Sequence, residues 1–367
     1  MARFQGENGY IHASPECIGV LLVNLGTPDK PTPSALRRYL AEFLSDPRVV
    51  EIPRLIWLPI LYGLILTRRP KKSAALYQSV WQEQGSPLMI HSLQQQAALQ
   101  KEMAIRFRGK VRIELAMRYG SPSIKSGMNT LKERGARRIL VLPLYPQYSA
   151  TTTATTYEAV FKVLKKWRWI PELRFIGQYH DEPAYIDALS RSVEDYWRQQ
   201  GSQEHLLMSF HGIPKRNLTL GDPYFCQCHK TARLLARRLN LKDKQWTISF
   251  QSRFGKAEWL QPYTDKTLQS LPKEKAIKKV DVICPGFPSD CLETLEEMAV
   301  ENRDNFLEAG GEQYRYIPAL NADHNHIQAL ADVIQKHSQG WAETSENFQA
   351  PQAGLIQERA KKLGAKH

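Results

Sequence analysis

The sequence predicts an α/β protein built from two similar domains, each a parallel β-sheet flanked by helices. Short apolar runs alternate with helical segments along the whole chain, which is the pattern of βαβ units. Related turn motifs recur in the same order in both halves, which indicates the duplication of one α/β domain. Two such domains facing each other would leave a cleft lined by strand ends, a common place for a ligand.

Length, charge and cysteine content narrow the possibilities. A chain of 367 residues is long enough for two domains. Its net charge of +13, from 50 basic and 37 acidic residues, favours an anionic partner: a nucleic acid, an acidic membrane surface or a carboxylated small molecule. The cysteines are odd in number and irregularly spaced, so they predict no disulfide framework and fit a reducing compartment: Cys17, Cys226, Cys228, Cys284 and Cys291.

The N-terminal domain is expected to cover residues 16–180. Residues 1–13 are polar and contain no apolar core, so we expect no signal peptide. The first strand, 18–25, ends at Gly26, and a helix then starts with Thr32 as N-cap and Pro33 as its first residue. Further strands are expected at 112–117, 139–144 and 173–176, and further helices at 92–107, 123–134 and 157–167.

One stretch of this domain, residues 52–72, departs from the alternation. Residues 55–66 are nearly all apolar, but Pro59 interrupts them and they are too short to span a bilayer. An apolar run beside a basic cluster is typical of a segment in a membrane interface, so we favour an exposed apolar lip over a core helix. Such a lip can also admit an apolar ligand. The basic residues that follow are Arg68, Arg69, Lys71 and Lys72.

The C-terminal domain is expected to cover residues 181–337 and to repeat this plan, followed by a polar, loosely ordered tail at 338–367. Strands are predicted at 206–210, 246–251 and 280–284. Helices are predicted at 182–200, 226–239 and 325–335, and a long helix follows the turn at Ser289-Asp290 and runs to about residue 309. The strand-end motifs of the halves correspond in order: Leu25-Gly26-Thr27-Pro28 with Phe210-His211-Gly212-Ile213-Pro214, Arg118-Tyr119-Gly120 with Arg253-Phe254-Gly255, and Leu144-Tyr145-Pro146-Gln147-Tyr148-Ser149 with Pro285-Gly286-Phe287-Pro288-Ser289.

The strongest chemical signal is His211, at the end of a short apolar strand. The strand stops there, because Gly212 permits a tight turn and Pro214 cannot continue a central strand. Ligands of open parallel sheets bind at the carboxyl edge, so His211 is a candidate site residue. Taken alone, such a residue is more often a buried histidine bonded to a carbonyl.

A row of carboxylates is the second signal. Glu293, Glu297 and Glu301 recur every four residues and therefore share one face of the predicted helix. A solvated acidic face explains most such rows, but this one begins at a strand end of a strongly basic protein. Carboxylates suit a hard divalent cation, and one added histidine suits iron or another transition metal. A histidine and a glutamate on opposite walls can also pass protons.

Aromatic residues close the same strand ends. Core packing explains any single one of them. Together with Arg118 and Arg253 they suit a flat, apolar ligand with carboxylates on its rim, because arginine stacks on aromatic planes and pairs with carboxylates. The aromatic residues are Tyr119, Tyr145, Phe254, Trp259 and Phe287.

With these residues in view, the chain resembles the ferrochelatases, which insert ferrous iron into a porphyrin to make haem. The resemblance covers residues 19–332, and it implies the type II chelatase fold: two Rossmann-like domains with the active-site cleft between them. Four motifs in family order carry it: Ser209-Phe210-His211-Gly212-Ile213-Pro214, Gly221-Asp222-Pro223-Tyr224, Gln251-Ser252-Arg253-Phe254-Gly255 and Ser289-Asp290-Cys291-Leu292-Glu293-Thr294-Leu295.

The resemblance also implies roles for single residues. His211 would be an iron ligand or the acceptor of a pyrrole proton, and Glu293 would face it as the second catalytic residue. Glu297 and Glu301 would continue the acidic path for metal or protons. Cys291 stands where some relatives carry a second histidine, which places more of the proton transfer on His211. Porphyrin-binding positions are matched by Leu25, Arg68, Arg69, Tyr77, Arg118, Tyr145, Ser252 and Phe287, to which the aromatic pattern adds Tyr119 and Trp259.

The predicted function is the insertion of Fe²⁺ into protoporphyrin IX with release of two protons, the terminal step of haem biosynthesis. Alternatives are a coproporphyrin ferrochelatase, a chelatase for another tetrapyrrole or metal, and a porphyrin or haem carrier. A nucleic-acid binder ranks last, because the basic residues are scattered. Fe²⁺ is expected as substrate, and no [2Fe-2S] cluster is expected because no cysteine follows Cys291. We expect a cytoplasmic enzyme at the inner face of the membrane, without a nucleic-acid partner.

Overall fold

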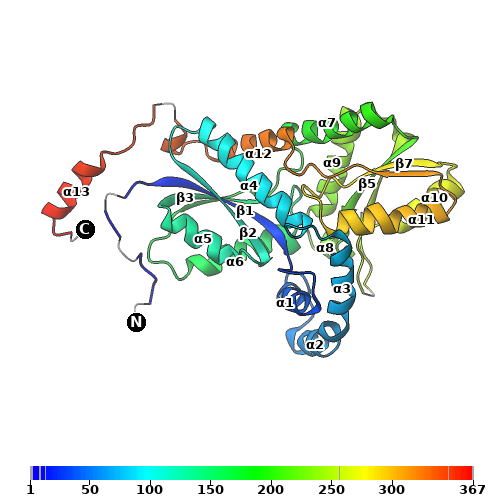
Figure 1. Cartoon of the computed structure of the whole chain (residues 1–367), viewed down its shortest axis with the longest axis horizontal. Coiled ribbons are helices and arrows are strands. Elements are labelled where there is room, and N and C mark those ends of the chain that lie inside the picture. The colour runs from blue at the N-terminus through cyan, green and yellow to red at the C-terminus, as the bar shows by residue number, and fades with distance from the viewer. Residues whose placement is uncertain (1–2, 8–9, 13, 256, 346, 366–367) are drawn as a thin grey trace.

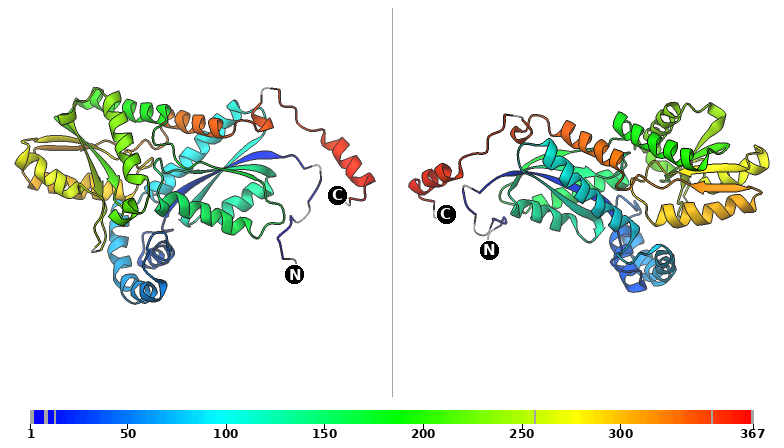
Figure 2. Two further views of the ribbon diagram at one scale, coloured as in Figure 1. Left: turned by 180° about the vertical axis from the view of Figure 1, so that it is seen from behind. Right: turned by 45° about the horizontal axis from the view of Figure 1, so that its top comes forward.

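The computed structural model describes residues 3–7, 10–12, 14–255, 257–345 and 347–365. Parts of the expected polar start and tail, namely residues 1–2, 8–9, 13, 346 and 366–367, lie outside the described residues. The described chain forms two α/β units that lie side by side along the long axis of the molecule (Figures 1 and 2).

Each unit contains one four-stranded parallel sheet. The first sheet has the order β2-β1-β3-β4, and the second has the order β6-β5-β7-β8. The second order is the first shifted by four strands, which agrees with the predicted duplication. The strands are β1 (Cys17–Thr27), β2 (Val111–Gly120), β3 (Ala136–Pro143), β4 (Glu172–Phe175), β5 (His205–His211), β6 (Trp246–Gln251), β7 (Lys279–Ile283) and β8 (Gln313–Tyr316).

Helices cover both faces of each sheet, and the central strands β1 and β5 are therefore almost entirely buried. The Thr32 hydroxyl accepts the Ala35 amide and starts the first helix as predicted. The helix predicted at 92–107 begins earlier, at Pro87, because Ser86 caps it. The helices around the sheets are α1 (Pro33–Leu44), α4 (Pro87–Arg106), α5 (Ile124–Glu133), α6 (Thr155–Leu164), α7 (Pro183–Gln200), α8 (Lys215–Thr219), α9 (Tyr224–Arg238), α10 (Thr264–Glu274), α11 (Asn302–Glu308) and α12 (His324–His337), with a short 3-10 turn η3 (Asp243–Gln245).

Three segments are π-helical, with hydrogen bonds that span five residues: η1 (Leu61–Ile65), η2 (Ala150–Ala154) and η4 (Glu293–Glu301). The acidic row was expected on an ordinary α-helix, and that expectation is wrong for residues 293–301. The reason is tertiary: side chains from other elements donate to carbonyls of η4, as described below.

The apolar lip forms an arm beside the sheets, made of α2 (Arg54–Ile60), η1 and α3 (Leu66–Val80) (Figure 1). It is helical through Pro59, which lacks the amide that would bond four residues back, and the helix widens into η1 directly afterwards. Leu55 is 93% exposed and Ile56 is 58% exposed, whereas Trp57 and Leu61 are buried. The lip thus has one face in the core and one in solvent.

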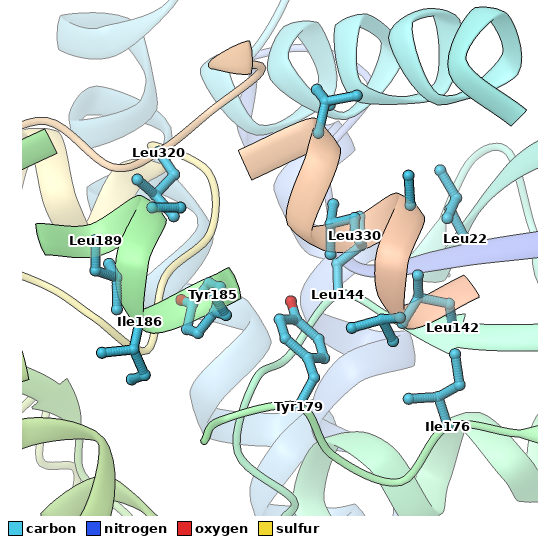
Figure 3. Close-up of a cluster of buried hydrophobic side chains, with 14 of the residues drawn as sticks. Leu22, Leu142, Leu144, Ile176, Tyr179, Tyr185, Ile186, Leu189, Leu320 and Leu330 are labelled. Carbon is cyan, nitrogen blue, oxygen red and sulfur yellow. The ribbon is translucent and has the colours of Figure 1, made fainter. Parts of the chain in front are cut away.

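The two units share a buried apolar core. Leu22, Leu142 and Leu144 of the first unit belong to it together with Leu330 of α12 and Tyr185 of α7 (Figure 3). Helix α12 packs against α4 as well as α7. The division between residues 180 and 181 remains a prediction, because this core continues across it.

The start of the tail contradicts the expected loose order. Trp341 and Glu343 are buried, and Glu343 pairs with Arg138 of β3. The Trp341 indole nitrogen donates to Glu172 at 2.7 Å. An indole and a paired carboxylate fix residues 341–343 against the first unit, which composition alone does not reveal. The tail contains η5 (Ala342–Thr344) and the exposed helix α13 (Ala353–Lys362).

None of the helices in the described part of the chain is long and apolar enough to cross a membrane.

Candidate active site

His211 is the last residue of β5 and is half-buried. Its Nδ1 lies 2.5 Å from the Gly212 carbonyl oxygen, which can only accept, so Nδ1 carries the proton. In the neutral imidazole Nε2 is then the acceptor, and it has no hydrogen-bond partner among the described residues. A Cβ on Gly212 would lie 2.8 Å from the Gln251 carbonyl and 3.2 Å from the Trp259 ring. Glycine therefore lets the His211 turn pack against β6 and Trp259.

Two further residues lie beside His211. In the sheet it pairs with Gln251, and its ring centroid lies 6.3 Å from that of Phe287. The Gln251 amide nitrogen reaches the Glu293 carbonyl at 3.3 Å and the Glu297 carboxylate at 3.4 Å. Gln251 thus connects the histidine strand to the acidic helix.

Glu297 is held from the other side by Ser252. The Ser252 amide donates to Oε1 at 2.8 Å, and the Ser252 hydroxyl donates to Oε2. Burial raises the pKa of Glu297, and the charge of Glu293 raises it further, against the opposing effects of the Ser252 bonds and of His211. Glu293 and His211 are therefore close enough to Glu297 to affect its pKa.

The acidic row runs from the interior to the surface. Glu293 and Glu297 are half-buried, and Glu301 is exposed. Burial raises the pKa of Glu296, and Glu301 adds to this effect while Lys72 of α3 opposes it. No group of three or more His, Cys, Asp or Glu side chains among the described residues is arranged to hold a metal ion. The ligand set His211, Glu293, Glu297 and Glu301 therefore remains a prediction.

Tyrosines of the first unit line the other side of Glu293. Burial raises the pKa of Tyr77, and the nearby charge of Glu293 adds to this. Tyr39, whose hydroxyl donates to the Gly26 carbonyl at 3.1 Å, is affected by Glu293 in the same way. Leu25 and Leu292 pack on the same buried cluster as Tyr77. The Tyr145 hydroxyl is buried and has no hydrogen-bond partner in the part of the chain that the structure describes. The structure thus brings Leu25, Tyr77 and Glu293 together.

Arg118 and Tyr119 are held by a buried carboxylate, and Tyr119 belongs to the same buried cluster as Tyr77. Arg118 pairs with Asp46 and donates to Thr155, and the Tyr119 hydroxyl donates to Asp46 at 2.9 Å. Burial would raise the pKa of Asp46, but bonds from Thr155 and Arg48 and the Arg118 charge hold it below its usual value. Tyr119 is fully buried. Arg118 lines a cavity of about 720 Å³ that contains none of the residues around His211.

The basic pair of α3 is available for an anion. Neither Arg68 nor Arg69 forms an ion pair with any described residue. Arg68 is exposed, while the Arg69 guanidinium lies 4.4 Å from the Phe254 ring centroid and burial lowers its pKa. Arg69 therefore connects the lip to the loop that carries Ser252.

Two carboxylates, Asp222 and Asp290, fix the site through contacts that were not predicted from the sequence. The Asp222 carboxylate accepts the Ser149 hydroxyl at 3.0 Å and the Ala150 amide at 2.8 Å, and so joins the units. Asp290 is buried, and its carboxylate accepts hydrogen bonds from the Thr294 hydroxyl at 2.9 Å and from the Tyr316 hydroxyl at 2.7 Å. Both lie within quoted motifs, which could have identified them.

Comparison with known proteins identifies the family of the chain. A ferrochelatase family model matches residues 17–338. The ferrochelatase of Thioalkalivibrio sulfidiphilus is 56% identical over 364 residues, covering 99% of this chain and 98% of the relative. That of Nitrosococcus oceani is 54% identical over 368 residues, covering 99% of this chain and 100% of the relative.

Solved structures show the same fold at low sequence identity. SirB from Bacillus subtilis with Fe³⁺ has a TM-score of 0.52 and 13% identity, covering 91% of this chain and 100% of that one. The sirohydrochlorin chelatase SirB from Bacillus subtilis subspecies spizizenii with cobalt has a TM-score of 0.50 and 12% identity, with the same coverage. These neighbours confirm the predicted type II chelatase fold of two Rossmann-like units. The family match and the relatives together show that the chain belongs to the ferrochelatases, lyases that take Fe²⁺ as a substrate.

Proposed function

We propose that this enzyme inserts Fe²⁺ into protoporphyrin IX and releases two protons, which forms protohaem. The observation that carries the proposal is the position of His211, whose Nε2 has no hydrogen-bond partner among the described residues and which lies close to the half-buried carboxylate of Glu297. A proton acceptor beside a carboxylate suits a reaction in which two N–H protons leave and a divalent cation enters.

The chemistry requires help because a planar porphyrin hides its nitrogen lone pairs. A tight site can bend the ring and use binding energy for that strain. His211 then accepts a pyrrole proton at Nε2, while the Gly212 carbonyl fixes the tautomer through Nδ1. Glu293 and Glu297 provide oxygen ligands that hold Fe²⁺ loosely enough to release it, and Glu301 continues the path to the surface.

Ring binding is assigned to the apolar residues around His211 and to the free cations. Leu25, Tyr77 and Phe287 lie where they contact the ring in this proposal. Arg68 and Arg69 hold the propionates, since neither cation has an ion-pair partner among the described residues and arginine pairs well with carboxylates. Arg118 and Tyr119 would have to give up their bonds to Asp46 in order to contact the porphyrin. We therefore assign the propionates to Arg68 and Arg69 rather than to Arg118.

Protoporphyrin is favoured over coproporphyrin by the lip, because an apolar entrance suits the ring with fewer carboxylates. The exposed apolar residues of the lip beside Arg68, Lys71 and Lys72 also suit an anionic membrane surface, so we place the enzyme in the cytoplasm at the inner face of the membrane. We propose no nucleic-acid partner and no [2Fe-2S] cluster. Turnover on the two porphyrins distinguishes the two substrates.

The test uses purified protein with Fe²⁺ and protoporphyrin, followed by the haem absorbance spectrum. Haem should form, and His211→Ala should abolish it while the exposed His324→Ala, at the start of α12, leaves it unchanged. Full turnover by His211→Ala would refute the assignment of His211. A carrier would bind porphyrin without turnover, so loss of haem formation in Glu293→Gln with porphyrin binding retained supports the enzyme.

A further inference from the structure

The acidic helix η4 has side-chain donors on three of its backbone carbonyls. Gln251 donates to the Glu293 carbonyl at 3.3 Å, Asn302 donates through Nδ2 to that of Glu297 at 2.9 Å, and the Tyr314 hydroxyl donates to that of Met298 at 2.6 Å. Gln251 and Tyr314 come from β6 and β8, and Asn302 is the first residue of α11, which continues η4 directly, so η4 is held by two strands and by its own continuation.

The Met298 carbonyl has a particular need for its donor. The Asn302 amide donates to the Glu297 carbonyl, five residues back. From Asn302 the chain is α-helical, and α-type spacing would pair the next amide, that of Arg303, with the Ala299 carbonyl four residues back. The change from π to α bonding therefore passes over the Met298 carbonyl, which would otherwise be a buried acceptor without a partner.

We propose that Tyr314 is a positioning residue for this reaction. Its hydroxyl caps the carbonyl left over at the π-to-α junction, and this contact fixes the turn on which Glu293 and Glu297 are displayed. Asn302 assists by donating to the adjacent carbonyl, that of Glu297. The Asn302 side chain is buried, and its Oδ1 has no hydrogen-bond partner among the described residues. The inference rests on the function proposed above for the carboxylates, the holding of Fe²⁺.

The structural reason for this role is register. If the junction loses its donor, the extra residue of the π-helix can be expelled and the helix returns to α bonding. One residue of register turns an α-helix by about 100°. Such a turn would move Glu297 away from the Ser252 amide, 2.8 Å distant, and from Gln251.

The experiment compares Tyr314→Phe with Ser338→Ala. Ser338 is buried, and its hydroxyl donates to the Ile334 carbonyl at 2.7 Å in α12, outside the site, so this control also deletes one hydroxyl from one carbonyl. Hydrogen exchange of residues 293–308 and the separate KM values for Fe²⁺ and porphyrin are measured. In Tyr314→Phe, both exchange and the Fe²⁺ KM should rise about tenfold, the equivalent of one lost buried hydrogen bond. The porphyrin KM should stay the same, and Ser338→Ala should change none of the three.

The outcomes separate this inference from the proposed function. Unchanged exchange at 293–308, or an equal change in Ser338→Ala, overturns the role of Tyr314. Faster exchange with an unchanged Fe²⁺ KM would support the fixing of η4 by Tyr314 but refute the binding of Fe²⁺ by the carboxylates of η4. If Tyr314→Phe does not fold, Asn302→Leu decides, since it keeps the size of the side chain and removes the donor to Glu297.

Discussion

Ser252→Ala tests the electrostatics of the site directly. The Ser252 hydroxyl donates to Oε2 of Glu297, and this bond opposes the rise in pKa that burial causes. Without it, the charged form of Glu297 loses support and its pKa must rise further. A hydrogen bond to a charged group contributes about 1.5–3 kcal/mol, and one pKa unit corresponds to about 1.4 kcal/mol, so the rise should be about 1–2 units.

The assay is the rate of haem formation as a function of pH. If turnover requires ionised Glu297, the acid limb of the profile should move to higher pH by that amount, while the rate on the alkaline plateau changes little. Ser252→Gly is the matched control for the backbone, because Ser252 has a φ of +64°, which glycine adopts without strain. Both variants keep the amide that donates to Oε1 and should shift the limb equally. An acid limb that stays in place in both variants would refute the reasoning.

The remaining predictions concern stability and membrane binding. Glu297→Gln should have a higher Tm than the wild type, and the difference should grow as pH rises above 4.5. The reason is that the pKa of Glu297 is raised in the folded state, so the wild-type protein loses stability as pH rises through that pKa; a Tm difference independent of pH contradicts this. Leu55→Asp combined with Ile56→Asp should weaken binding to anionic vesicles by about tenfold or more, with Tm nearly unchanged. The reason is that burying each of these exposed side chains in the membrane can contribute about 1.5–3 kcal/mol. Binding as tight as that of the wild type would contradict membrane contact by the lip. Asp222→Ala removes the acceptor of Ser149 and Ala150 and should lower the free energy of unfolding by about 1–3 kcal/mol in denaturant titrations, whereas the exposed Asp243→Ala should not; equal stabilities would contradict the contact between the units.

The strands and the histidine were predictable because their signals are local. A buried parallel strand needs a continuous apolar run, and the residues at 206–210 supply one that ends in a turn. Since parallel strands share a carboxyl edge, the order of motifs was enough to place His211 near Phe287, and the ring distance agrees.

The parts that failed depend on residues distant in sequence. The π-helical form of 293–301 depends on Gln251 and Tyr314, which the four-residue spacing of glutamates cannot reveal. The role of Arg118 in porphyrin binding stays a prediction, but its ion pair with Asp46, which follows α1, could not be predicted from the motif around Arg118. The tail was expected to be loosely ordered because its composition is polar, and a single buried indole, that of Trp341, hardly changes that composition.

A crystal structure with protoporphyrin bound tests the central claim most directly. The account predicts the ring beside His211, between Phe287 and the wall formed by Leu25 and Tyr77, with its propionates at Arg68 and Arg69. A ring bound instead in the cavity beside Arg118, with His211 and Glu297 left uncovered, would contradict it.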